Sequence, residues 1–310
     1  MAGEAEPKGG RWLTSTAASA AEHGPPVTSF GQPGDVLAGR FRIRRTLARG
    51  GMGLVLESFD EALATPVALK LILPELASSP AAMERLRREV ILARRITHRN
   101  VCRIFDFFTT VDGGEPRVFF TMELLAGETL AERISRERIA PGEALEFARQ
   151  MAEGLEAAHA ESVVHRDFKS SNVMLVPAEG GGLRLVVGDF GISRAIDPGH
   201  VPGDLTASQS LLGTPAYMAP EQVLGQSAVT PATDTYAFGV VLYEMVTGVV
   251  PFRAETPLAT ALLRLTAPVP RASERVPGLP AIWDEVIQRC QERLKRYDEA
   301  AKLAKKQSGR

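Results

Sequence analysis

The chain has 310 residues, of which 45% are apolar, and its formal net charge is −1. This apolar content can build a sizeable core, and the near-zero charge gives no electrostatic reason to expect a nucleic-acid or anionic-membrane partner. The two cysteines, Cys102 and Cys290, exclude a disulfide framework, and we expect them to be cytosolic thiols. The first dozen residues lack the apolar core of a signal peptide. The most apolar stretch, 236–252, is interrupted by Glu244, so we expect a buried helix there, no membrane span, and a cytoplasmic protein.

The two ends of the chain show no apolar period. Residues 1–35 are rich in Ala, Gly, Pro, Ser and Thr, which predicts a flexible leader and leaves a docking or regulatory role open. Residues 301–310 form a basic tail, either an amphipathic helix or a frayed end.

A glycine-containing hairpin is expected after the leader. From Phe41 onward apolar and basic residues alternate, as is typical of a strand. Glycines lack a Cβ, so backbone amides in such a turn can approach a triphosphate closely. A plain hairpin remains the alternative. The turn and its flanks contain Leu47, Gly50, Gly51, Gly53 and Val55.

A second strand, Val-Ala-Leu-Lys, ends at Lys70 and places Ala68 and Lys70 on one face. Lys70 is either a solvated lysine at a strand end or a phosphate ligand. The following residues, 81–96, have the apolar spacing of a helix. Glu89 within that helix is an exposed charge, a partner of Arg85, or an ion-pair partner of Lys70.

The middle of the chain alternates between strand and helix patterns. Residues 118–125 read as a buried strand that runs into an extended connection, and helical periods follow over 130–135 and 143–160. Val173 and Met174 predict a short strand, and 177–182 a glycine-rich hairpin tip.

Two carboxylates, a carboxamide and an ammonium group occur close together between these segments. Asp167, Lys169 and Asn172 belong to His-Arg-Asp-Phe-Lys-Ser-Ser-Asn, and Asp189 to Asp-Phe-Gly. Oxygen ligands beside a lysine indicate a magnesium–phosphate site better than a zinc or a nucleophile site. Asp167 could orient a hydroxyl, while Asn172 and Asp189 could hold metal ions.

These motifs resemble those of the Hanks-type serine/threonine protein kinases, with the wording of bacterial members. The resemblance rests on H-R-D-x-K-x-x-N, D-F-G, V-A-L-K, the glycine loop and Gly-Thr-Pro-Ala-Tyr-Met-Ala-Pro-Glu ending at Glu221. It implies an α+β, two-lobed fold with a small antiparallel-sheet lobe carrying one helix and a larger, mainly helical lobe. The kinase domain would span 36–300, with the small lobe at about 36–125 and the large lobe at about 126–300.

The resemblance also implies roles for individual residues. Lys70, paired with Glu89, would position the ATP phosphates, while Asp167 accepts the proton and Lys169 offsets charge on the transferred group. Asn172 and Asp189 would hold Mg²⁺, with Mn²⁺ as a substitute. The adenine pocket would be formed by Leu47, the loop glycines, Val55, Ala68, Met122, Glu123, Leu125 and Met174.

The segment from 192 to 218 corresponds to an activation segment, for which the resemblance implies phosphorylation. Arg166 would receive the phosphate. Its candidate acceptors are Thr206, Ser208, Ser210 and Thr214.

Three other expectations complete the family pattern. Asp234 would brace the catalytic loop by accepting hydrogen bonds from the backbone near His165. The chain departs from the pattern at Ala48, where the family has its first loop glycine, and at the C-terminal end, which lacks Asp-Pro. The partner of Glu221 would then be Arg296 or Arg293.

The expected function is transfer of the ATP γ-phosphoryl group to Ser or Thr hydroxyls of proteins, with self-association allowing phosphorylation of its own chain. A catalytically weak nucleotide-binding scaffold, or pseudokinase, is the alternative, although no catalytic lysine or aspartate is missing. A small-molecule kinase should lack the Gly-Thr-Pro segment that precedes Glu221, and a pure interaction module would not need the whole ligand set.

Overall fold

The computed structural model describes residues 31–50, 53–74, 79–112, 114–178, 180–190, 215–225 and 229–292. Several predicted features lie outside these ranges. They comprise most of the leader, the basic tail, Gly51, the four candidate phosphosites, Arg293 and Arg296.

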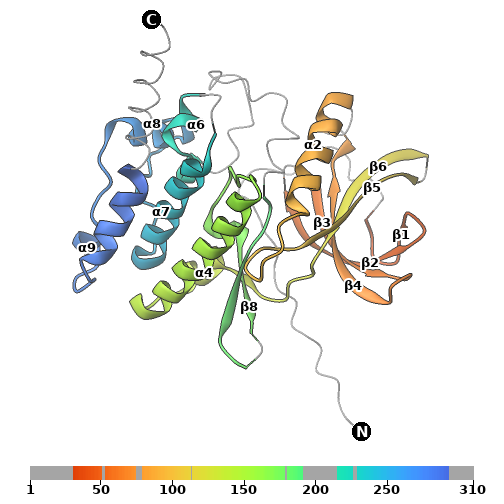
Figure 1. The fold of residues 1–310 in the computed structure, drawn as a ribbon, viewed down its shortest axis with the longest axis horizontal. Coiled ribbons are helices and arrows are strands. Elements are labelled where there is room, and N and C mark those ends of the chain that lie inside the picture. The colour runs from red at the N-terminus through yellow and green to blue at the C-terminus, as the bar shows by residue number, and fades with distance from the viewer. Residues whose placement is uncertain are drawn as a thin grey trace, which may run out of the picture. The chain divides into compact units, whose positions relative to one another are not determined.

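The described chain divides into two compact units that do not follow chain order. Residues up to Leu130 join the segment that begins at Ser171, and Ala131–Ser170 join the residues of the C-terminal part. The first unit contains a six-stranded antiparallel sheet in the order β1-β2-β3-β4-β6-β5 (Figure 1). This confirms the predicted antiparallel sheet. Its strands are β1 (Val36–Leu37), β2 (Phe41–Gly50), β3 (Gly53–Asp60), β4 (Thr65–Ile72), β5 (Ile104–Asp112) and β6 (Glu115–Met122).

The core of this sheet is made by the alternating apolar residues of its strands. Phe41, Phe108 and Phe119 form an aromatic cluster, in which the Phe108 and Phe119 rings stack with centroids 4.9 Å apart and Phe41 meets both edge-on. Phe41 and Phe119 are fully buried, which stabilises the fold by about 2–3 kcal/mol for each ring. In the first half of β2, Arg42 and Arg44 alternate with the buried Phe41 and Ile43 and face solvent, which confirms the predicted alternation there.

Helix α2 (Pro80–Ala93) belongs to the same unit as the sheet (Figure 1). Ser79 caps its N-terminus by accepting a hydrogen bond from the Ala82 amide, and a proline occupies the first turn. The buried face consists of Ala82, Leu86, Val90 and Ala93. The helix was predicted over 81–96 and ends three residues earlier, at Ala93.

A small three-stranded sheet completes the first unit. It contains β7 (Glu128–Thr129), β8 (Val173–Pro177) and β9 (Leu183–Val187), which pair in the order β7-β8-β9. Strands β8 and β9 form a hairpin in which Val173 lies opposite Val187. The predicted hairpin tip at 177–182 is therefore confirmed.

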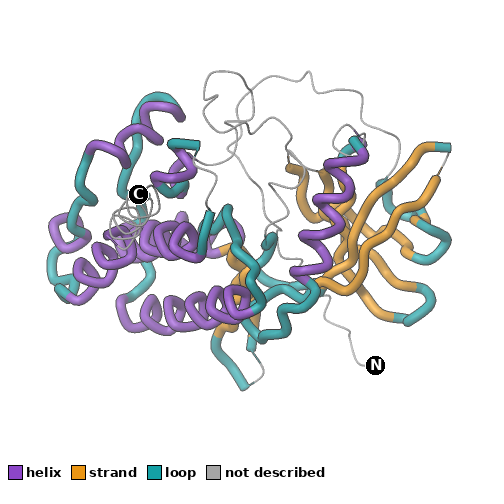
Figure 2. Tube along the Cα trace, turned by 45° about the horizontal axis from the view of Figure 1, so that its top comes forward, coloured by secondary structure: helices purple, strands orange, loops and turns teal. Residues whose placement is uncertain are grey.

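The second unit is mainly helical, as Figure 2 shows. Residues 282–292 are also helical. Two short elements have residues in both units: α3 (Leu130–Arg136), which begins at the last residue before the second unit, and η1 (Ser170–Asn172), which ends in the first. The other elements of the second unit are α4 (Pro141–Ala160), η3 (Pro215–Tyr217), α6 (Pro220–Val223), α7 (Pro231–Thr247), α8 (Pro257–Thr266) and α9 (Ala272–Arg275).

Helix α7 is the central helix of the second unit, and it corresponds to the apolar stretch for which a buried helix was predicted. Thr230 caps it, Pro231 starts it, and Gly248 ends it in the left-handed conformation. Gly239 lies so close to the helical residues 282–292 that a Cβ on it would be 2.7 Å from the Cβ of Cys290. Among the described helices, none is both long and apolar enough to cross a bilayer.

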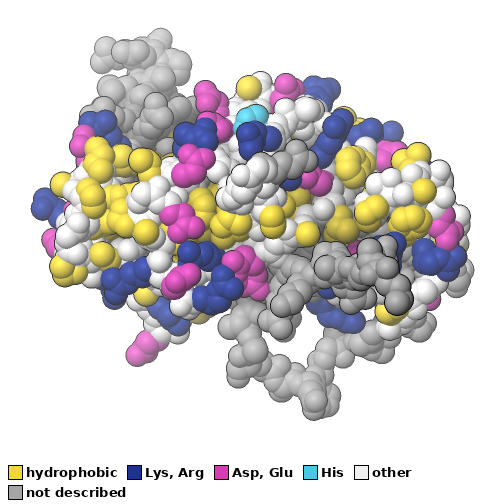
Figure 3. All heavy atoms as spheres, turned by 90° about the horizontal axis from the view of Figure 1, so that it is seen from below, with side chains coloured by type: hydrophobic (Ala, Val, Ile, Leu, Met, Phe, Trp, Pro, Cys, Tyr) yellow, Lys and Arg dark blue, Asp and Glu magenta, His cyan; other side chains and the backbone are white. Residues whose placement is uncertain are grey.

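Charged side chains of both signs are interspersed on the face shown in Figure 3. On the sheet, Arg42 pairs with Glu61 and Arg45 with Glu57, each at 2.7 Å. These exposed pairs contribute at most about 1 kcal/mol each. The mixture of positive and negative side chains on this face agrees with the chain's formal net charge of −1.

The predicted glycine hairpin gives a first test. Gly53 has φ +148°, and a Cβ on it would lie 1.8 Å from the Leu71 carbonyl oxygen of the neighbouring strand. We expect Gly53→Ala to lower the free energy of unfolding by at least about 2 kcal/mol in urea titrations.

Gly50→Ala is the matched control, because a Cβ on Gly50 would meet no atom within 4 Å. We expect it to change stability by less than about 0.5 kcal/mol. Equal stability of the two variants would contradict the close approach at Gly53.

Candidate active site

The glycine hairpin joins β2 and β3 as predicted. Gly50 pairs with Gly53, and Ala48 pairs with Val55. Ala48 is buried within the sheet, so its extra methyl group is accommodated where the family has glycine. The close approach of Gly53 to Leu71 gives this glycine a structural reason that is independent of any phosphate.

Lys70 is buried and forms an ion pair with Asp189, whose side chain is 17% exposed. Strand β4 places Lys70 between Val55 of β3 and Phe120 of β6, and its Nζ lies 2.7 Å from Asp189 Oδ1. Asp189 follows β9 and adopts φ +58°, an unfavourable conformation for a residue with a Cβ. The structure thus brings together an ammonium and a carboxylate 119 positions apart. Glu89 lies half-buried on α2, and its pairing with Lys70 stays a prediction.

Asn172 and Asp189 occur at the same end of the β8–β9 hairpin. Asn172 precedes β8, Asp189 follows β9, and the Gly188 amide donates to the Asn172 carbonyl at 2.9 Å. The hairpin therefore joins the two predicted metal ligands within one unit. Among the described residues, no cluster of three or more His, Cys, Asp or Glu side chains could hold a metal ion by itself. A carboxylate and a carboxamide fit Mg²⁺ that takes its remaining ligands from phosphate and water.

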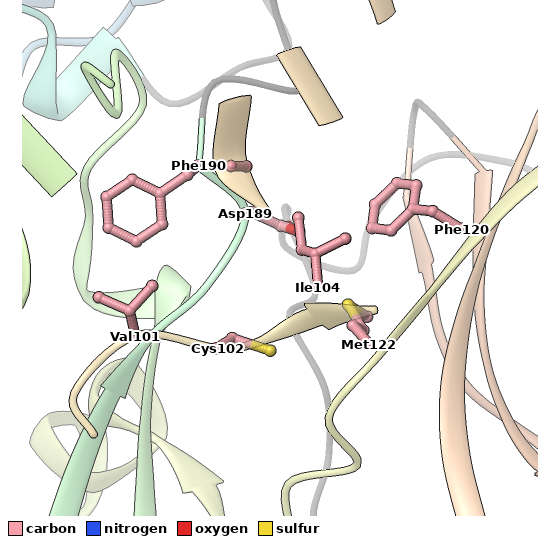
Figure 4. A pocket seen from close by; sticks show the side chains of 8 residues that line it. Val101, Cys102, Ile104, Phe120, Met122, Asp189 and Phe190 are labelled. Atoms are coloured by element: carbon pink, nitrogen blue, oxygen red, sulfur yellow. The ribbon is translucent and has the colours of Figure 1, made fainter. Parts of the chain in front are cut away.

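A small, mostly apolar pocket adjoins Asp189 in the first unit (Figure 4). Met122 borders it, and Ala68 of β4 lies opposite Met122 of β6 in the sheet register. Met174 is also buried, on β8. The remaining lining residues are Ala93, Val101, Cys102, Ile104, Phe120 and Phe190.

The thiol of Cys102 is buried in this pocket wall. Burial, followed by the negative charges of Glu123 and Asp189, raises the pKa of the Cys102 thiol, so this cysteine is protonated and unreactive.

The predicted hinge begins directly after β6. Glu123 pairs with Arg184 of β9 at 2.9 Å, and Leu125 is buried. Strand β6 ends at Met122, and residues 123–126 belong to no helix or strand. Leu47, on the glycine hairpin, is partly exposed.

Asp167 and Lys169 lie together in the second unit. Lys169 is buried, and its Nζ donates to Asp167 Oδ2 at 2.8 Å, while the Asp167 side chain is 34% exposed. An accessible carboxylate beside a fixed ammonium can accept a hydrogen bond from an approaching hydroxyl. The predicted neighbourhood of these two residues is therefore present.

Asp234 braces the catalytic loop as expected. Its buried carboxylate accepts hydrogen bonds from the backbone amides of His165 and Arg166, both at 2.8 Å, and lies 2.7 Å from His159 Nε2. Arg166 is held at φ +69°, a strained conformation that costs about 1–3 kcal/mol. The side-chain Nε2 of Gln222 donates a further hydrogen bond to the Arg166 carbonyl at 2.7 Å. These contacts hold the residue before Asp167 in a fixed conformation.

Sequence reasoning missed a hydrogen-bond chain that links three elements of the second unit. The Tyr217 hydroxyl donates to Glu244 Oε2 at 2.6 Å, and Ser170 Oγ lies 3.0 Å from the same hydroxyl. Tyr217 belongs to η3, Glu244 to α7, and Ser170 follows Lys169 directly. The only signal in the sequence was a glutamate inside the apolar stretch.

Glu221 is buried, and Thr233 of α7 donates to its Oε1 at 2.5 Å. Sequence reasoning also missed Arg264 of α8, which is buried and donates to the Pro215 carbonyl of η3. Burial lowers the pKa of Arg264. Both contacts fix the segment that leads into α6.

Comparison with known proteins supports the resemblance to protein kinases. The sequence matches the protein kinase domain family over residues 41–296. It is 36% identical over 257 residues to the serine/threonine-protein kinase PknA of Mycobacterium tuberculosis, covering 82% of this chain and 57% of PknA. It is 36% identical over 255 residues to the serine/threonine-protein kinase Pkn1 of Myxococcus xanthus, covering 82% of this chain and 36% of Pkn1. The chain thus spans little more than half of PknA and about a third of Pkn1.

Solved structures agree on the fold. The kinase domain of M. tuberculosis PknI matches with a TM-score of 0.63 at 23% identity, covering 84% of this chain and 90% of that one. The chain belongs to the protein kinase domain family, and its relatives place it with the Hanks-type serine/threonine kinases.

Glu244 gives a prediction for pH dependence. Burial raises the pKa of its carboxyl, and the hydrogen bonds from Tyr217 and Ser170 offset only part of that effect. Stability from this group is complete below the ordinary glutamate pKa. It is lost as pH rises toward the folded-state pKa, because the unfolded chain releases its proton first.

We expect Glu244→Gln, which keeps an acceptor for Tyr217, to be less sensitive to pH than the wild type. Urea unfolding at about pH 5 and about pH 8 measures this, and the wild type should lose stability relative to the variant at the higher pH. A wild-type loss no larger than that of the variant would contradict the burial of Glu244.

Proposed function

We propose that this chain is a serine/threonine protein kinase domain, spanning about 36–300, that transfers the γ-phosphoryl group of ATP to Ser or Thr hydroxyls of proteins. The observation that carries the proposal is the Lys70–Asp189 ion pair, in a chain of the protein kinase family that also holds Lys169 on Asp167. The names of the relatives, which are serine/threonine-protein kinases, support the choice of acceptor.

In the first unit, the proposed task is to bind and orient ATP. The Lys70 ammonium, which contacts Asp189 in this structure, would also contact the phosphates. Glu89 would hold Lys70 in position. Adenine would lie against Ala68, Met122 and Met174, with backbone groups of Glu123–Leu125 as its hydrogen-bond partners. Leu47, Val55 and the glycines of the hairpin would cover the nucleotide.

Asn172 and Asp189 would hold Mg²⁺, or Mn²⁺ in its place. The bound cation neutralises charge on the phosphate oxygens. The chain contributes the two oxygen donors at one end of the β8–β9 hairpin, and the ion pair with Lys70 holds the Asp189 carboxylate in place. This small donor set suits a cation that arrives with its nucleotide.

In the second unit, the proposed task is to activate the acceptor hydroxyl. Asp167 would orient the Ser or Thr hydroxyl and take its proton while the oxygen forms a bond to the γ-phosphorus. The bond from that phosphorus to the bridging oxygen breaks, and ADP leaves. Lys169 would offset charge on the transferred group, and Asp234 would keep the loop rigid.

We further propose that the substrates are proteins, including a second copy of this chain. Thr206, Ser208, Ser210 and Thr214 are the proposed acceptors on the chain itself, with Arg166 as the phosphate receiver. The free thiol of Cys102 and the presence of ATP in the cytoplasm support action in that compartment.

Phosphotransfer from labelled ATP with Mg²⁺ tests the proposal. Asp167→Asn and Lys70→Met should each lower the initial rate at least about 100-fold, because one removes the proton acceptor and the other a phosphate ligand. Arg45→Met, which removes an exposed ion pair on the same sheet as Lys70, is the matched control and should keep the wild-type rate.

Label on the wild-type chain should map between Thr206 and Thr214 by peptide mass spectrometry. Folding of every variant is checked by urea unfolding. A folded wild type that transfers no label to itself or to a mixture of proteins would contradict the proposal and favour a nucleotide-binding scaffold.

A further inference from the structure

Arg184 of β9 connects three segments of the first unit. Its Nη2 donates to Glu123 Oε1 at 2.9 Å, and its Nη1 donates to the Arg99 carbonyl at 2.7 Å. Glu123 is the first residue after β6. A guanidinium presents its donors in a rigid, planar arrangement. Two acceptors therefore fix the position of the guanidinium, and the guanidinium in turn fixes the distance between the Glu123 carboxylate and the Arg99 carbonyl.

The backbone around Glu123 is held as well. The Glu123 amide donates to the Arg103 carbonyl at 2.9 Å, and the Cys102 thiol lies 3.9 Å from the Glu123 carbonyl. Thus both the side chain and the backbone of the residue after Met122 are attached to neighbouring segments. Residues 99–103 form one of these segments, and β9 forms the other.

The segment 99–103 is itself attached to β9. Asn100 Nδ2 donates to the Leu185 carbonyl at 2.7 Å, and the Val187 amide donates to the Asn100 carbonyl at 2.9 Å. The Cys102 amide donates to the Val187 carbonyl at 2.8 Å. The contacts therefore close a ring that runs from Arg184 to Glu123, then to the segment 99–103, and back to β9.

This ion pair differs from the surface pairs of the sheet. The side chains of Arg184 and Glu123 are 23% and 30% exposed, against 50% and 39% for Arg42 and Glu61. Arg184 also binds a backbone carbonyl. Partial burial and a second acceptor make the geometry of the pair more restrictive than that of an exposed pair.

We propose that Arg184 is a positioning residue for the adenine ring of the nucleotide. By holding Glu123, it fixes the backbone of Glu123–Leu125, whose amide and carbonyl groups would bind adenine. The inference rests on the proposed function, because it requires that ATP binds at this connection. It assigns to β9 a role on the adenine side, beyond carrying the chain to Asp189.

Calorimetric titration with ADP and with inorganic tripolyphosphate, each with Mg²⁺, tests this role. Arg184→Met and Glu123→Gln should each weaken ADP binding about five- to tenfold, since a hydrogen bond to a charged group is typically worth a factor of about ten. Tripolyphosphate, which lacks adenine, should bind each variant within about twofold of the wild type. In steady-state assays KM for ATP should rise by the same factor as the ADP dissociation constant, with kcat changed less than about twofold.

A double variant separates coupling from general damage. Arg184→Met with Glu123→Gln should bind ADP no more than about twofold more weakly than either single variant, because both remove one interaction. Arg42→Met, the matched control, should bind ADP as the wild type does. Thermal unfolding checks each fold, and Arg184→Lys, which keeps the charge without the fork, should show an intermediate loss and serves if Arg184→Met does not fold.

Equal ADP binding by the wild type and Arg184→Met would overturn the role of Arg184 alone. An equal loss of ADP and tripolyphosphate binding would also overturn it, since the effect would then not concern adenine. Absence of ADP binding by the folded wild type would overturn this inference and the proposed function together.

Discussion

The ion pair between Lys70 and Asp189 is the interaction on which the first unit depends. Lys70 is buried and Asp189 is partly buried. Taking charged groups out of water costs free energy, and a buried pair is rarely more stable than apolar side chains of similar volume. The surrounding strands nevertheless hold Nζ and Oδ1 2.7 Å apart, with Asp189 in a strained conformation. Such an arrangement has a physical reason if a polyanion and its cation take over the two charges when they bind.

A second buried carboxylate organises the helical unit in a different way. The Asp234 oxygens accept hydrogen bonds from the amides of His165 and Arg166 and hold the loop that carries Asp167. Helix α7, which carries Asp234, is buried along most of its length, so the carboxylate has a rigid base. The strain at Arg166 is balanced by these bonds. In both units, the apolar core holds the backbone that carries these charged side chains, which are Lys70 and Asp189 in the first unit and Asp234 in the second.

Much of the fold could be predicted from local pattern. Alternation predicted β2, the spacing of Leu86, Val90 and Ala93 predicted α2, and the apolar stretch around Glu244 predicted α7, because each pattern lies within one element. The motifs also made Asp167, Asn172 and Asp189 candidate site residues, and their roles stay predictions. The contacts of Arg184 and of Tyr217 could not be predicted, because their partners lie 61 and 27 positions away and depend on how strands and helices meet. The pairing of Lys70 with Asp189 could not be predicted for the same reason, because the two residues are 119 positions apart.

We propose that a magnesium-bound nucleotide binds at the Lys70–Asp189 pair. The most direct measurement compares ADP affinity with and without Mg²⁺ in the wild type and in Asp189→Asn. We expect Mg²⁺ to strengthen ADP binding to the wild type about tenfold or more and to have little effect in the variant, which has lost a charged oxygen ligand. The same Mg²⁺ dependence in both proteins would contradict it.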